Sequence, residues 1–128
     1  MPGAKEALQQ LREDGYKLAL ASSSPHLWIY PVIERFGLKE AFDAIVSAED
    51  IVGLSKPSPD IYIETASRLG VNPAECVAIE DSRNGIKSAK DVGMKVLGYK
   101  SDDNLEQDIS GADAIINDLL KVLNIVRE

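Results

Sequence analysis

Apolar residues along this 128-residue chain follow two patterns that alternate from one end to the other. Stretches with an apolar residue every three or four positions predict helices over residues 4–13, 27–36, 59–69 and 83–92, with a last helix from Asp118. Short apolar runs between turn residues predict strands over 17–21, 44–47, 77–79, 95–98 and 114–116. Such alternation is typical of a parallel sheet with helices on both faces. We therefore expect residues 1–128 to form a single doubly wound α/β domain.

Composition and charge narrow the range of partners. With 45% hydrophobic and 27% charged residues, the chain is typical of globular domains. Its net charge of −7 argues against nucleic acid or an anionic membrane as the main partner. No apolar stretch is long enough to span a bilayer. Cys76 is the only cysteine, so no disulfide forms within the chain, and this fits a reducing, cytoplasmic location.

Two adjacent carboxylates, those of Glu80 and Asp81, end the apolar run that starts at Val77. Open α/β sheets bind their ligands at the carboxyl ends of strands. Magnesium prefers hard oxygen ligands and is usually bound through one or two carboxylates plus substrate phosphates. The pair is therefore a candidate Mg²⁺ site. The structural alternative is that the two acids only stabilise the start of the following helix.

Two further polar features follow predicted strands. Ser22, Ser23 and Ser24 offer hydroxyl and backbone N–H groups that would hold a phosphate at the start of a helix. Alternatively, one serine caps that helix and the others face water. Lys56 lies in a loop over residues 53–58, where its ammonium group would neutralise a phosphoryl group or a nucleophilic carboxylate. The alternative for this lysine is simple solvation.

Taken in order along the chain, these features resemble the haloacid dehalogenase superfamily. The resemblance rests on Leu-Ala-Leu-Ala-Ser-Ser-Ser at 18–24, Lys-Pro-Ser-Pro-Asp at 56–60 and Glu-Asp-Ser-Arg-Asn-Gly at 80–85. The last two stretches are among the more specific signatures of that family. The resemblance covers roughly residues 2–100 and is strongest to the β-phosphoglucomutase-like sugar-phosphate phosphatases.

The resemblance implies a Mg²⁺-dependent phosphatase or phosphomutase that acts on a small phosphorylated metabolite, such as a sugar phosphate, through an aspartyl-phosphate. Ser22 would then hydrogen-bond the transferred phosphoryl group. Lys56 would stabilise the aspartyl nucleophile and the phosphoryl oxygens. Asp81 would bind Mg²⁺, and Glu80 would support the metal directly or through water. The further phosphate contacts implied by the resemblance come from Ser23 and Ser24.

The chain departs from the family pattern at the nucleophile. In the family this residue lies in an Asp-x-Asp-x-(Thr/Val) motif after the first strand, and here no two aspartates are separated by a single residue. The sequence looks like the core domain without its first strand, nucleophile, general acid/base and cap, so we expect it to be inactive alone. In the family the first strand lies between the strands predicted at 17–21 and 77–79. Its loss would leave two strand edges unpaired and invite self-association, unless the two strands pair directly or another chain fills the gap.

Three alternative functions make different demands on the sequence. A non-catalytic relative of the same fold would keep these loops only to bind phosphate or Mg²⁺, as a regulatory module. A receiver-like signalling domain would place its acidic pair after the first strand and its lysine late, the reverse of the order here. A serine hydrolase would carry a Gly-x-Ser-x-Gly turn, which the chain lacks. The single histidine, His26, is expected at a surface or cap, and Trp28 is expected to pack inside or, alternatively, to lie exposed where a cap would cover it.

Overall fold

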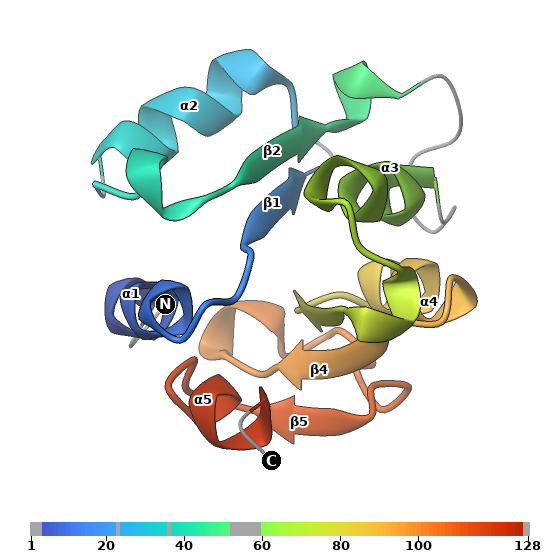
Figure 1. Cartoon of the computed structure of the whole chain (residues 1–128). Helices are drawn as coiled ribbons and strands as arrows, with labels where there is room; N and C mark the ends of the chain where they lie inside the picture. The colour runs from blue at the N-terminus through green and yellow to red at the C-terminus, as the bar shows by residue number, and fades with distance from the viewer. Residues whose placement is uncertain (1–3, 23, 36, 52–59, 127–128) are drawn as a thin grey trace.

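The computed structural model describes residues 4–22, 24–35, 37–51 and 60–126, and its elements alternate along the chain as predicted (Figure 1). The helices are α1 (Ala4–Glu13), α2 (His26–Arg35), α3 (Asp60–Leu69), α4 (Arg83–Asp91) and α5 (Lys121–Val126). The strands are β1 (Ala19–Ser22), β2 (Ala44–Ser47), β3 (Val77–Glu80), β4 (Lys95–Tyr99) and β5 (Ala114–Ile116). None of the described helices combines the length and the apolar character needed to cross a bilayer.

Most boundaries lie within one residue of the prediction, but two elements begin two or three residues later than predicted. β1 begins at Ala19 rather than at residue 17, because the N–H of Leu18 donates to the side-chain carboxylate of Asp43 (2.7 Å) instead of to a strand partner. The last helix begins at Lys121 rather than at Asp118. In both cases a short polar side chain binds the backbone and takes the place of regular pairing.

The described strands form two parallel sheets rather than one. β1 pairs with β2, with Ala19 opposite Ala44, and β3, β4 and β5 form the second sheet, with Val77 opposite Lys95. Across the described part of the chain, β1 and β3 do not pair with each other, so each keeps one edge without a neighbouring strand. The expectation of two unpaired edges is confirmed, and direct pairing of the two strands does not occur.

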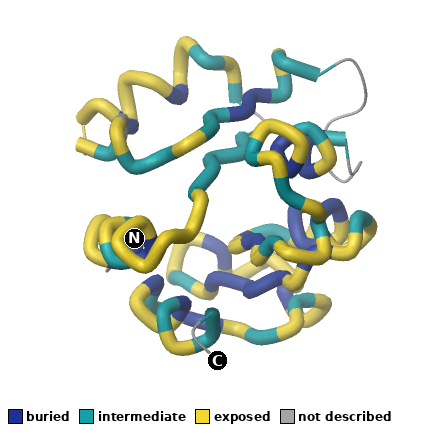
Figure 2. Tube along the Cα trace, viewed as in Figure 1, coloured by how far each residue is buried: buried dark blue, intermediate teal, exposed yellow. Residues whose placement is uncertain are grey.

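Helices cover both faces, as expected for a doubly wound domain. α3 packs against β1, β2 and α4, while α4 packs against β3 and β4. The core beneath them draws residues from both sheets, including Val46, Ala78 and Val96. On the opposite face, α1 and α5 pack together over a second core that contains Leu97 and Ile116 (Figures 1 and 2).

The direction of α3 relates the two sheets to each other. In its first turn, the hydroxyl of Tyr62 donates a hydrogen bond to Glu80, the last residue of β3. At its other end, the carbonyl of Leu69 accepts a hydrogen bond from Nζ of Lys17 (2.8 Å), just before β1. α3 therefore runs from the carboxyl end of β3 to the amino end of β1. It follows that the carboxyl ends of β1 and β3 lie at the same end of the molecule.

The outer surface of α2 is apolar and exposed. Leu27 is 80% exposed and Trp28 is 69% exposed, and Figure 2 shows much of this helix as exposed. The helix is held to the rest of the fold through buried Ile29 and Ile33. The expectation that Trp28 packs inside is therefore wrong, and its alternative, an exposed Trp28, is confirmed.

Candidate functional site

The carboxyl ends of the strands bring the predicted polar features to one end of the molecule. Ser22 is the last residue of β1, Glu80 is the last residue of β3, and Asp81 follows it directly. Ser24 lies in the turn between β1 and α2. Two of the predicted residues, Ser23 and Lys56, lie outside the described residues.

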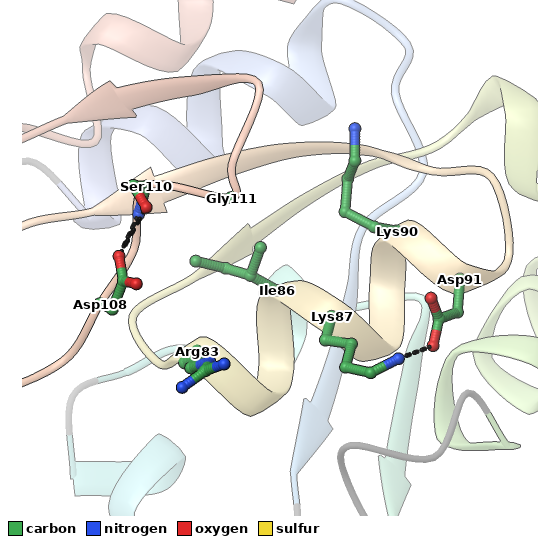
Figure 3. A pocket seen from close by; sticks show the side chains of 8 residues that line it. All are labelled: Arg83, Ile86, Lys87, Lys90, Asp91, Asp108, Ser110 and Gly111. Carbon is green, nitrogen blue, oxygen red and sulfur yellow. Dashed lines mark hydrogen bonds and ion pairs between the residues drawn. The ribbon is translucent and has the colours of Figure 1, made fainter.

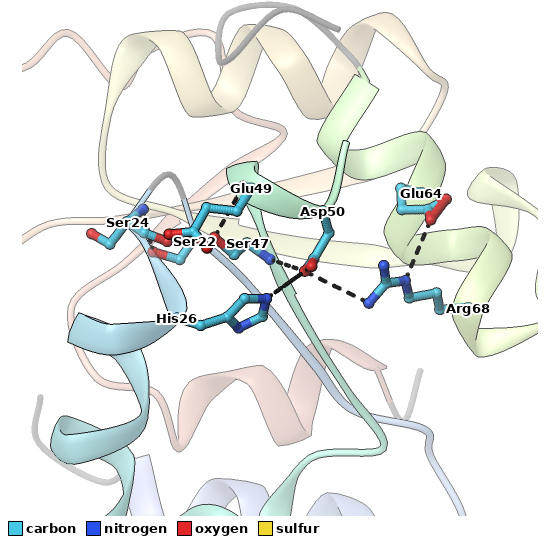
Figure 4. Close-up of polar contacts among 8 residues, drawn as sticks. All are labelled: Ser22, Ser24, His26, Ser47, Glu49, Asp50, Glu64 and Arg68. Carbon is cyan, nitrogen blue, oxygen red and sulfur yellow. Dashed lines mark hydrogen bonds and ion pairs between the residues drawn. The ribbon is translucent and has the colours of Figure 1, made fainter. Parts of the chain in front are cut away.

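The serine turn is closed by its own hydrogen bonds. The N–H of Ser24 donates to Oγ of Ser22 (3.1 Å), and the carbonyl of Ser24 accepts from Oγ of Ser47 (2.7 Å) (Figure 4). Oγ of Ser22 accepts the N–H of Ser24 and still has its own proton to donate. A hydroxyl that donates in this way suits a phosphoryl oxygen.

A second polar cluster ties this turn to the chain that leaves β2. Nε2 of His26 lies 2.8 Å from both carboxylate oxygens of Asp50, and Asp50 also accepts the N–H of Ser47 at 2.8 Å. Nη1 of Arg68 lies 3.7 Å from the same carboxylate (Figure 4). The hydrogen bond from His26, followed by that from Ser47, lowers the pKa of Asp50 below its ordinary value. The half-buried ring of His26 therefore anchors the start of α2 rather than lying free at the surface.

The sequence does not predict this cluster, because His26 and Asp50 are 24 positions apart. The contacts of this cluster nevertheless lie beside the candidate site. The cluster joins the Ser22–Ser24 turn to the segment that leads into residues 52–59, where Lys56 lies.

The two adjacent carboxylates have different surroundings. Glu80 is 8% exposed and accepts a hydrogen bond from the hydroxyl of Tyr62 on α3, whereas Asp81 is exposed. Side chains of consecutive residues in a strand point to opposite faces, which accounts for the difference. Burial, together with the nearby carboxylate of Glu80, raises the pKa of Tyr62, so its hydroxyl keeps its proton and remains a donor.

A glycine on α4 makes room for the Glu80 carboxylate. A Cβ atom at Gly85 would collide with the carboxylate carbon and both oxygens of Glu80. The N–H of Gly85 donates to Oγ of Ser82 (3.0 Å), which makes Ser82 the N-cap of α4. The start of α4 is thus capped by Ser82, so neither Glu80 nor Asp81 is the N-cap residue of this helix.

Asn104 holds the backbone at Asp81 in place. Its buried side-chain NH₂ group donates to the carbonyls of Asp81 and Tyr99, both at 2.8 Å. Its Oδ1 accepts the N–H of Ser101 at 2.8 Å. Sequence reasoning missed this residue, because an asparagine in a polar segment gives no sign of which distant carbonyls it will bind.

The donor chemistry at the end of β3 fits Mg²⁺. Asp81 offers an accessible carboxylate, and Glu80 is the residue that precedes it. Among the described residues, no three histidine, cysteine or acidic side chains gather at one point. An accessible carboxylate such as that of Asp81 suits a cation held through one or two carboxylates plus phosphate oxygens, as Mg²⁺ usually is.

A depression in the surface lies elsewhere. It has a volume of about 340 Å³ and lies between α4 and the segment before β5 (Figure 3). Its polar side chains largely bind each other: Lys87 pairs with Asp91 at 2.8 Å, and Ser110 donates to Asp108 at 2.6 Å. None of the sequence-predicted site residues lines it, so it is not the candidate site.

Known proteins are similar to this chain in sequence and in architecture. A family model described as haloacid dehalogenase-like hydrolase matches residues 1–93. The chain is 42% identical over 97 residues to hexitol phosphatase B of Escherichia coli strain K12, an alignment that covers 76% of the chain and 43% of that protein. It is 32% identical over 130 residues to the phosphorylated carbohydrates phosphatase of Thermotoga maritima, covering 99% of the chain and 59% of that protein.

Solved structures agree with the fold. The crystal structure of beta-phosphoglucomutase from Clostridium difficile matches with a TM-score of 0.83 at 26% identity, over 99% of this chain and 54% of that one. The chain thus spans about half the length of the relatives it matches. The resemblance to β-phosphoglucomutase-like phosphatases that the motifs indicated is confirmed.

Proposed function

The chain belongs to the haloacid dehalogenase-like hydrolase family, and on that premise we propose that it is the core portion of a Mg²⁺-dependent phosphatase or phosphomutase. Its substrate would be a small phosphorylated metabolite such as a sugar phosphate, in the cytoplasm. The observation that carries this proposal is the position of Ser22 and Asp81 at the same carboxyl end of parallel strands. The names of the relatives, a hexitol phosphatase and a phosphorylated carbohydrates phosphatase, support the substrate class.

Each site residue has a chemical role in this proposal. The hydroxyl of Ser22 donates to a phosphoryl oxygen, and the ammonium group of Lys56 stabilises negative charge on the phosphoryl group. Asp81 holds the Mg²⁺ ion, which when bound supplies further charge stabilisation for the phosphoryl oxygens. Glu80 supports the metal directly or through water. The remaining phosphate contacts come from Ser23 and Ser24.

The covalent step needs a carboxylate that attacks phosphorus while the sugar oxygen leaves with a proton, after which water releases phosphate from the aspartyl-phosphate. The family motif that would carry this carboxylate does not occur in residues 1–128. Neither a lysine ammonium nor a serine that donates a hydrogen bond replaces it in this scheme. We therefore expect no turnover by the 128-residue chain alone.

A chimera tests the proposal directly. The part of hexitol phosphatase B that precedes its matching segment would be fused to this chain, and hydrolysis of p-nitrophenyl phosphate would be followed with Mg²⁺. We expect turnover that Asp81→Ala and Lys56→Ala abolish. Glu13→Ala should leave it intact, because Glu13 is an exposed acid at the end of α1, before the amino end of β1. The unfused chain is the blank. Turnover by the blank that both substitutions remove would contradict the proposed absence of a nucleophile.

A second candidate function is a non-catalytic module that binds phosphate or Mg²⁺. The observation in its favour is the same missing motif, combined with a retained strand-end site. A folded chimera with no turnover on any sugar phosphate, together with Mg²⁺ binding to the chain that is lost in Asp81→Ala, would favour this module over the enzyme. Isothermal titration with Mg²⁺ alone measures the second property.

A further inference from the structure

We propose that Ser47 and the His26–Asp50 pair are positioning residues for phosphate binding, because they fix the turn over residues 22–24 at two points. The inference rests on the proposed function, in which the hydroxyl of Ser22 donates to a phosphoryl oxygen. The three positioning side chains lie at the end of β2, just after it and at the start of α2 (Figure 4). In this account they act through the turn and do not touch the phosphate.

The pairing of β1 with β2 places the first attachment beside the turn. Ser22 and Ser47 are opposite each other at the carboxyl ends of the two strands. Ser47 is fully buried, and its Oγ donates to the carbonyl of Ser24 at 2.7 Å. The N–H of Ser24 is bound as well, to Oγ of Ser22 at 3.1 Å. The peptide groups on either side of Ser24 are therefore both fixed in orientation, and one of them holds the hydroxyl of Ser22.

His26 provides the second attachment. Its Nε2 lies 2.8 Å from both carboxylate oxygens of Asp50, so this nitrogen carries a proton and donates whatever the charge on the imidazole. Asp50 in turn accepts the N–H of Ser47 at 2.8 Å. Because only Pro25, whose side chain fixes its own φ angle, separates Ser24 from His26, these contacts form a closed ring. A turn that is attached at two points keeps its direction, whereas a single attachment lets it rotate.

The segment to which the turn is attached is itself held in place. Ala48–Asp50 form a short 3₁₀ helix that Ser47 caps, since Oγ of Ser47 accepts the N–H of Glu49 at 3.1 Å. Nη1 of Arg68, on α3, lies 3.7 Å from the Asp50 carboxylate. The ring of contacts therefore connects the turn to a capped segment that α3 also contacts.

A fixed turn matters for affinity. A donor that is already oriented loses little conformational freedom when it binds a ligand, so more of the energy of its hydrogen bond appears as affinity. Removing either attachment should therefore weaken phosphate binding, although no group that touches the phosphate is lost. Binding of Mg²⁺ by Asp81, which follows a strand of the other sheet, should not change.

The test measures binding of inorganic phosphate to the whole chain in the presence of Mg²⁺, from the amide resonances of Ser22 and Ser24 in heteronuclear NMR spectra. We expect Ser47→Ala to weaken phosphate binding about tenfold, while the Mg²⁺ affinity from isothermal titration changes by less than about twofold. His26→Ala should weaken phosphate binding by a similar factor. His26→Gln should recover most of that loss, because the side-chain NH₂ group of glutamine donates to Asp50 in place of Nε2.

Two further variants separate positioning from a loss of stability. Ile33 is buried on the same helix as His26, so Ile33→Val loosens the packing of α2 but removes no contact of the turn and should leave phosphate affinity unchanged. The double variant of Ser47→Ala and His26→Ala should lose much less affinity than the product of the two single losses, because both act on one turn. Urea unfolding shows which variants are folded, and the His26 variants test the same turn if Ser47→Ala is not.

Four results would overturn the inference. If the chain binds phosphate and folded Ser47→Ala and His26→Ala bind it equally well, the ring is purely structural and the proposed function stands. Equal weakening by Ile33→Val would assign the effect to general loosening of α2. His26→Gln that binds as weakly as His26→Ala would remove the bond to Asp50 from the explanation. If the Ser22 and Ser24 amides of the unsubstituted chain do not respond to phosphate, the phosphate role of the turn fails, and the proposed function fails with it.

Discussion

At the scale of single residues, the end of β3 depends on close contact between Glu80, Tyr62 and Gly85. The buried carboxylate of Glu80 accepts the Tyr62 hydroxyl and occupies the space that a side chain at position 85 would need. We expect Gly85→Ala to displace this carboxylate. The lost hydrogen bond to a charged group costs about 1.5–3 kcal/mol, partly offset by about 1 kcal/mol from replacing glycine within a helix. Urea unfolding should therefore show a net destabilisation of about 0.5–2 kcal/mol.

A double-mutant cycle separates this mechanism from a general packing defect. Tyr62→Phe removes only the hydroxyl, so Gly85→Ala should cost less in that background than in the unsubstituted chain. Additive free energies of unfolding would show that the two substitutions act independently, contrary to this account.

The second prediction at this scale concerns Asn104, which fixes the backbone carbonyl of Asp81. Asn104→Asp keeps the oxygen that accepts the N–H of Ser101 but removes both donors to the carbonyls of Asp81 and Tyr99. Because Asn104 is buried, we expect a loss of about 3 kcal/mol in the free energy of unfolding. The exposed neighbour offers a control, since Asp103→Asn should change it by less than about 0.5 kcal/mol. Equal effects of the two substitutions would argue against the role given to Asn104.

At the scale of elements, one carboxylate joins α4 to β4 just before β5 begins. Asp113 accepts the N–H of Val96 at 2.7 Å and Nζ of Lys90 at 2.7 Å, and its own N–H donates to the carbonyl of Val96 at 2.8 Å. The hydrogen bond from Lys90, and then that from Val96, lowers the pKa of Asp113 below its ordinary value of 3.8. The carboxylate therefore stabilises the fold in its ionised form.

This sets the pH dependence of Asp113→Asn. A carboxyl group with a lowered pKa in the folded state contributes its stability above pH 3.8 and loses it as the pH falls through the lowered value. We expect the urea midpoint of Asp113→Asn to lie below that of the unsubstituted chain at pH 7, and the gap to close in acid as the electrostatic part disappears. Lys90→Gln removes the larger cause of the lowered pKa of Asp113. In that background, the difference in urea midpoint that Asp113→Asn makes should begin to close nearer pH 3.8. A gap that does not depend on pH would contradict the assignment.

The elements were predictable from the sequence, whereas the contacts between them were not. Every main element was predictable, because apolar spacing and turn residues are local properties of the chain. The end of β3 was predictable as a polar site for the same reason, since Glu80 and Asp81 follow an apolar run. Which of the two acids is buried was not predictable, because that depends on Tyr62 from another element. The anchoring roles of Asn104 and His26 also depend on contacts between distant segments.

At the scale of the whole molecule, α3 is the main link between the two sheets, and its buried face should decide how cooperatively they unfold. Ile61 is 1% exposed within the core that both sheets share, whereas Ile63 on the same helix is 51% exposed. We expect Ile61→Ala to cost about 2–5 kcal/mol and Ile63→Ala less than about 1 kcal/mol. Because the second sheet keeps its own core against α1 and α5, Ile61→Ala should speed amide exchange more in β1 and β2 than in β4. Equal acceleration in both sheets would mean that they unfold as one cooperative unit, contrary to this expectation.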